Sequence, residues 1–71
     1  MHPATDHLLS LFEYEHLPPH LQAVSKPCAD LAHQMAHTLA SGPELTTGLR
    51  KLLEAKDCLV RQAVIDSRKE A

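Results

Sequence analysis

Aromatic residues are nearly absent from this 71-residue chain, which has no Trp, one Phe and one Tyr. A core built on large rings is therefore excluded, and Leu, Ala, Val, Ile and Met must fill it. Apolar residues still make up 44% of the sequence, which is ordinary for a folded protein. Both aromatics, Phe12 and Tyr14, lie just before the double proline Pro18-Pro19. The two rings thus fall outside the long segments with helical periodicity.

Cysteine and long apolar runs are also scarce. The two cysteines, Cys28 and Cys58, are too few for a disulfide-dense secreted scaffold. No apolar stretch approaches the roughly 20 residues that span a bilayer. The first residues lack the basic segment and apolar run of a signal peptide. We therefore expect a cytoplasmic protein with reduced thiols and no membrane partner.

Charge and motifs narrow the function classes. The formal net charge is −2, so non-specific nucleic-acid binding is disfavoured and no DNA partner is expected. The sequence has no GxSxG, HExxH, P-loop or CxxC motif and no nucleophile–base arrangement. We expect no enzyme activity and no cofactor. Glu54 and Asp57 are expected to form surface ion pairs with Arg50, Lys51 or Arg61.

The length allows one domain, residues 1–71, and the periodicity predicts an all-α fold. We expect an antiparallel helical hairpin preceded by a short N-terminal helix over about 6–15. Thr5 or Asp6 would cap that helix, and its apolar face would comprise Leu8, Leu9 and Phe12. A domain this small is marginally stable alone, and natural solutions are disulfides, a metal or oligomerisation.

The first long helix is predicted over about 19–40. Large apolar residues recur along it at nearly heptad spacing, which predicts the seam of the hairpin. These residues are Leu21, Val24, Cys28, Leu31, Met35 and Leu39. Pro27 lies inside the pattern and removes one backbone hydrogen bond. Either the helix bends at this proline or it starts there.

The second long helix is predicted over about 42–67. Ser41 and Glu44 have the spacing of a capping box, with Pro43 in the first turn. The connection between the long helices is short, so they must be antiparallel neighbours. The apolar residues form two stripes, namely positions 45, 49, 52, 59 and 63, and positions 53, 60 and 64. One hairpin covers one stripe, and the other needs a further subunit or the N-terminal segment. We therefore expect a homo-oligomer.

Two residue pairs have alternative interpretations. Cys28 and Cys58 lie at similar heights on facing helices, as a redox pair would. We favour two small buried apolar residues instead. His33 and His37 have a spacing that can bind zinc, but no complete ligand set accompanies them. A solvated polar face is the favoured interpretation, so no metal site is expected.

Two single residues are the best ligand candidates. Lys56 lies where the seam of the second helix would have an apolar residue. Its ammonium either extends to water or holds a phosphate or carboxylate between helices or subunits. Tyr14 either covers the open end of the hairpin or stacks on a planar ligand. Such stacking contributes about 1–3 kcal/mol per base.

Three segments together resemble a known family. They are the Phe12-x-Tyr14 segment before the chain break, Asp30-Leu31-Ala32, and the run from Leu49 to Ala55. Over roughly residues 12 to 65, the chain resembles the small phage-encoded helical hairpin of anti-CBASS protein 2 and the anti-Thoeris nucleotide sponges. Members of that family are not enzymes, and they form homo-oligomers, often hexamers. They trap cyclic dinucleotides between paired subunits and cyclic trinucleotides at a separate site.

The resemblance implies a function and a set of site residues. The chain would sequester cyclic oligonucleotide immune signals in the cytoplasm of a bacterial host and so block CBASS-like defence. The family tyrosine that stacks on a base corresponds to Tyr14. The phosphate-binding basic residue corresponds to Lys26, although alignment on residues 30–32 places Ser25 there. Cys58 stands where the family has an aromatic residue.

Cations of the second long helix could make further contacts to phosphate, namely Lys56, Arg50 and Arg61.

Three other functions remain as alternatives. The first is a structural or protein-binding hairpin that oligomerises without a small-molecule ligand. The others are a nucleic-acid-binding accessory and a metal-stabilised hairpin.

Overall fold

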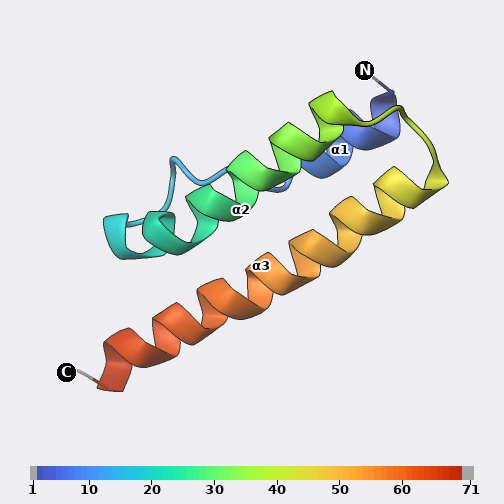
Figure 1. Ribbon diagram of the computed structural model, residues 1–71. Helices are drawn as coiled ribbons and strands as arrows, with labels where there is room; N and C mark the ends of the chain where they lie inside the picture. Colours follow the sequence, from blue (N-terminus) through green and yellow to red (C-terminus); the bar gives the residue numbers. More distant parts are fainter. Residues whose placement is uncertain (1, 70–71) are drawn as a thin grey trace.

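The computed structural model describes residues 2–69, and these form three helices and no strand. They are α1 (Pro3–Ser10), α2 (Pro19–Thr38) and α3 (Pro43–Lys69). α2 and α3 run alongside each other in opposite directions, and α1 packs on both of them (Figure 1). The predicted all-α class is confirmed. None of these helices combines the length and the apolar character that crossing a membrane requires. Residues 1, 70 and 71 of the predicted domain lie outside the described residues.

α1 begins and ends earlier than the predicted 6–15. Its N-cap is His2, whose ring Nδ1 accepts a hydrogen bond from the Ala4 backbone N–H at 3.1 Å. The prediction of a cap at Thr5 or Asp6 was wrong because the fixed φ of Pro3 starts the helix sooner. The helix stops at Ser10, and Leu11 is its C-cap. The segment that carries Tyr14 is therefore a connection rather than the last turn of a helix.

The core forms where the three helices meet. Phe12 is fully buried, and Leu8 and Leu9 are buried beside it, as the apolar face of the N-terminal segment predicted. From the long helices the core takes Ala29, Ala32, Ala36, Leu45, Leu49 and Leu53. The only Phe therefore lies outside the long helices because it closes the core between them.

α2 faces this core with small side chains. It runs through Pro27 without interruption, so a helix start at that proline is excluded. The prediction that the large apolar residues form the internal seam was wrong. Leu31 and Leu39 are 44% and 52% exposed, while Ser25, Ala29, Ala32 and Ala36 are buried. Three helices share this core, and small side chains let their backbones approach closely.

α3 starts at Pro43, slightly later than predicted. The Gly42 carbonyl accepts the first helical hydrogen bond, from the Thr46 N–H at 3.2 Å. Gly42 therefore occupies the cap position that the capping-box spacing assigned to Ser41. The predicted stripes also divide differently. Leu53 is buried with Leu45 and Leu49, whereas Leu59, placed in the first stripe, is 53% exposed.

The hydroxyl groups of Thr5 and Ser25 are buried in this core and have no hydrogen-bond partner among the described residues. An unpaired buried hydroxyl costs about 1–3 kcal/mol in desolvation. Ser25→Ala should therefore leave the free energy of unfolding unchanged or raise it by about 1 kcal/mol, as measured by urea denaturation. The matched control is Ala29→Ser, which adds a buried hydroxyl to the same stripe and should destabilise. A clear loss of stability in Ser25→Ala would show that the hydroxyl has a partner after all.

Candidate functional site

The fold places Tyr14 within electrostatic reach of Lys26. Tyr14 is half-buried and packs against the core cluster, whereas Lys26 is exposed. The Lys26 ammonium lies 2.8 Å from the Asp30 carboxylate, one turn further along α2. The hydrogen bond to Asp30 and the negative charge of Asp30 raise the pKa of Lys26, and the Tyr14 phenol adds a smaller contribution. The two residues that the resemblance assigns to base and phosphate therefore lie within electrostatic reach of each other.

The segment that carries Tyr14 is tied to the start of α2. The Leu17 N–H donates to the Tyr14 carbonyl at 2.9 Å. The Gln22 side-chain amide donates to the carbonyls of Leu17 at 2.8 Å and Glu15 at 3.3 Å. These bonds hold the backbone around Tyr14, whose half-buried side chain packs against the core cluster. The structure thus places Tyr14 as a cover of the core.

Ser25 is a correction to the predicted set of ligand contacts. Its side chain is fully buried, so in the single chain it cannot reach a ligand at the surface. The reason is the phase of α2, in which Ser25 shares the inward stripe with Ala29 and Ala32. Successive residues of an α-helix are rotated by about 100°, so Lys26, the next residue, points to the surface. Of the two aligned candidates, only Lys26 is accessible.

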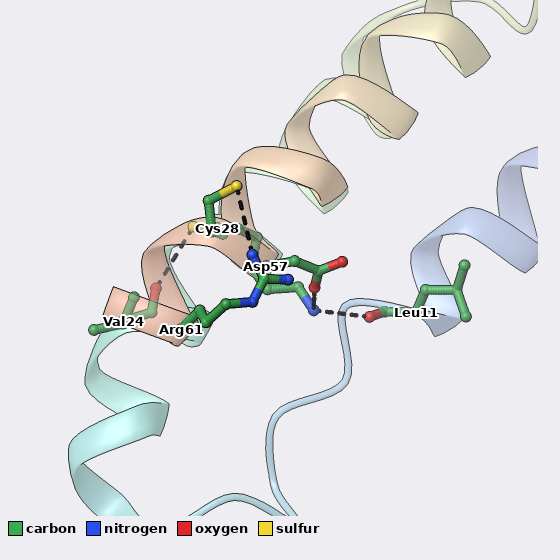
Figure 2. Close-up of polar contacts among 7 residues, drawn as sticks. Leu11, Val24, Cys28, Asp57 and Arg61 are labelled. Carbon is green, nitrogen blue, oxygen red and sulfur yellow. Dashed lines mark hydrogen bonds and ion pairs between the residues drawn. The ribbon is translucent and has the colours of Figure 1, made fainter. Parts of the chain in front are cut away.

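Lys56 has its partners within the chain. Its side chain is 12% exposed, and its ammonium lies 2.8 Å from the Asp57 carboxylate. It also donates a hydrogen bond to the Leu11 carbonyl at 3.3 Å and lies 5.9 Å from the centroid of the Phe12 ring. The bonds to Asp57 and Leu11 are visible in Figure 2. Because Leu11 is the C-cap of α1, Lys56 neutralises the negative end of that helix and fixes it to α3.

Arg61 has more freedom. It is exposed, and its only polar contact among residues 2–69 is a bond from Nη1 to the Cys58 sulfur at 3.9 Å (Figure 2). Lys56 and Arg61 line one hollow of about 490 Å³, which we call the Lys56–Arg61 hollow. Glu13 and His16 from the Tyr14 segment also line it. Two of the five predicted site residues therefore meet there, beside residues that flank Tyr14 in sequence.

None of the ion pairs expected on α3 is present among the described residues, so this prediction was wrong. Asp57 pairs with its neighbour Lys56 and not with the predicted arginines or Lys51. In the part of the chain that the structure describes, Glu54 forms no ion pair. Arg50 and Lys51 are left with their charges open to solvent.

The two cysteines do not form a disulfide. Cys28 and Cys58 are free thiols. Cys28 is half-buried and its sulfur donates to the Val24 carbonyl at 3.5 Å (Figure 2). Cys58 is exposed, so the prediction of two buried residues was wrong for this position.

His33 and His37 are exposed on α2 with stacked rings, whose centroids are 6.5 Å apart. The His37 ring also bonds through Nδ1 to the His33 carbonyl at 2.7 Å. Between residues 2 and 69, no three His, Cys, Asp or Glu side chains come together as a metal ion would need. The pair is therefore a stacked surface pair on the polar face of the helix.

Sequence reasoning missed an apolar groove between α2 and α3, with a volume of about 390 Å³. It is lined by Leu31, Met35, Leu39, Glu44, Leu45, Gly48, Leu49 and Leu52. The signal for it was present in the heptad spacing of the large apolar residues. The residues with this spacing were predicted to lie inside the hairpin, but in the structure much of their surface remains exposed.

The chain was compared with family models, curated proteins and solved structures, and it matches none of them.

The position of Lys56 gives a stability prediction. Lys56→Met keeps the apolar stem but removes the bond to the Leu11 carbonyl, and a hydrogen bond to a charged group contributes about 1.5–3 kcal/mol. We expect the free energy of unfolding to fall by about 1–2 kcal/mol in urea denaturation, with faster hydrogen exchange at the α1 amides. Lys51→Met, an exposed lysine on the same helix, should change stability by less than about 0.5 kcal/mol. Equal effects in the two variants would contradict the docking role of Lys56.

Proposed function

We propose that the protein is a non-catalytic sponge for cyclic oligonucleotide immune signals, with cyclic dinucleotides as its main ligand. A homo-oligomer of helical hairpins would hold the signal and starve a CBASS-like defence of it in a bacterial host. The main support is that Tyr14 and Lys26, which are 12 positions apart in sequence and belong to different segments, lie within electrostatic reach of each other. The resemblance gives these two residues the roles of base-stacking ring and phosphate-binding cation.

The chemistry of the pair suits a nucleotide. The half-exposed Tyr14 ring offers a flat surface on which a base can stack. Lys26 is exposed and bound only to Asp30, so a phosphate can compete with that carboxylate for its ammonium. A two-fold assembly presents two such pairs, and a cyclic dinucleotide has two bases and two phosphates. Arg61 adds an open cation near the same segment, while Lys56 is already neutralised.

The groove between α2 and α3 supports self-assembly. It exposes almost only apolar side chains, and Gly48 leaves its floor open because nothing lies within 4 Å of the Cβ that this residue lacks. On α3, Leu45, Leu52 and Leu59 repeat every seven residues along the groove side. This spacing is typical of helices that pack against other helices as in a coiled coil. A second copy supplies a helix face with the same repeat, and we propose it as the occupant.

The stacking role of Tyr14 can be tested by substitution. Tyr14→Ala should abolish capture of cyclic dinucleotides in isothermal calorimetry, while native mass spectrometry shows an unchanged oligomer mass. Tyr14→Phe keeps the ring and should bind within a few-fold of the original chain. Unimpaired binding by Tyr14→Ala would reject this site.

The assembly has its own test. Leu39→Glu places a charge in the groove at a half-exposed position, so the single chain should still fold while the oligomer dissociates. Light scattering coupled to size exclusion measures the mass. Ile65→Glu is the matched control, because Ile65 is exposed on the opposite side of α3 from the groove. A monomeric original chain at micromolar concentration would rule out both the assembly and a site shared between copies.

A second candidate function rests on the same groove. A structural or protein-binding hairpin would use it for a partner protein and would need no nucleotide. Calorimetry with a panel of cyclic di- and trinucleotides separates the two functions, since this alternative predicts no heat with any of them.

A further inference from the structure

A second hollow lies between α1 and α3, on the other side of α3 from the apolar groove. It measures about 310 Å³, and we call it the His7–Arg50 hollow. α1 contributes Ala4, His7 and Leu8, and α3 contributes Thr46, Thr47, Arg50, Lys51 and Glu54. Its apolar floor is Ala4 and Leu8, and its rim is made of polar and charged side chains.

The rim has more donors than acceptors. Within residues 2–69, Arg50 and Lys51 form no ion pair, although Glu54 lies one turn away on the same helix. The Thr46 hydroxyl already donates to the Pro43 carbonyl at 3.1 Å. No hydrogen bond within the described chain engages the Thr47 hydroxyl or the His7 ring, so both can donate to a ligand. With His7 neutral, the two cations and Glu54 leave the rim with an excess of one positive charge.

We propose that the His7–Arg50 hollow binds a phosphate-bearing small molecule. Arg50 offers a planar fork of N–H donors, and Lys51 offers a compact charge beside it. Thr47 and His7 provide hydrogen bonds to the remaining phosphate oxygens. Glu54 opposes an anion, so it tunes the site toward weak, exchangeable binding. This inference concerns different residues from those of the Tyr14–Lys26 pair and does not depend on the proposed function.

Inorganic phosphate is the probe, followed by ¹H–¹⁵N NMR of the full chain, with acetate as a carboxylate probe. We expect saturable shifts at the amides of Thr47, Arg50 and Lys51. The Arg50→Gln/Lys51→Gln double variant should bind phosphate about tenfold more weakly. Glu54→Gln should bind it several-fold more tightly because the opposing charge is gone. A purely structural role of Glu54 does not predict this gain.

Arg68→Gln is the matched control, since Arg68 is exposed on α3 near its far end and should leave phosphate binding unchanged. An equal loss in Arg68→Gln and the double variant would overturn the site in favour of diffuse surface charge. Equal binding of acetate, or no saturable response at millimolar phosphate, would also overturn it. Capture of cyclic dinucleotides should persist in the double variant and fail in Tyr14→Ala, so the two sites can fail separately.

Discussion

Close packing of α1 and α3 on the small-residue stripe of α2 is the constraint on which the rest of the structure depends. Ala29, Ala32 and Ala36 leave space for the leucines of α3 and for Phe12, which is fully buried. A bulkier stripe would separate the helices and leave Phe12 without a pocket. Because small side chains line the inward face of α2, the large apolar side chains of this helix lie on its other faces. The apolar groove is therefore a consequence of how the core is built.

The same packing explains where the candidate site residues lie. Phe12 anchors the chain after α1, and the bond from Lys56 to the Leu11 carbonyl fixes the end of that helix on α3. The chain then has to pass from this anchor to the start of α2 at Pro19, and Tyr14 lies on that path. The phase of α2 that buries Ser25 also turns Lys26 outward, toward the Tyr14 segment. The Tyr14–Lys26 pair is thus a product of core packing.

Much of this fold could be predicted from the sequence, and the failures share a physical cause. The prolines at positions 19 and 43 mark the starts of α2 and α3, and Leu8, Leu9 and Phe12 form the predicted buried face. Periodicity shows which residues share a face of a helix, but it does not show which face lies inside. The large residues, such as Leu31, were therefore predicted to face inward, because Ala is only weakly hydrophobic and the alanine face was the less apolar of the two. The bond from Lys56 to Leu11 was beyond prediction, since it spans 45 positions.

If Tyr14 and Lys26 bind a nucleotide as we propose, the energetics of these two residues tie ligand capture to assembly. Stacking on one ring contributes about 1–3 kcal/mol, whereas even millimolar binding requires about 4 kcal/mol. Lys26 is exposed to solvent and already paired with Asp30, so replacing one anion by another gains little. Under the proposed function, a single chain would therefore bind a scarce signal too weakly to retain it. Two copies double the rings and cations on one ligand, and the loss of translational freedom is incurred only once. Under the proposed function, the open apolar groove and the modest single-chain site belong together, because self-association would create the affinity that one chain lacks.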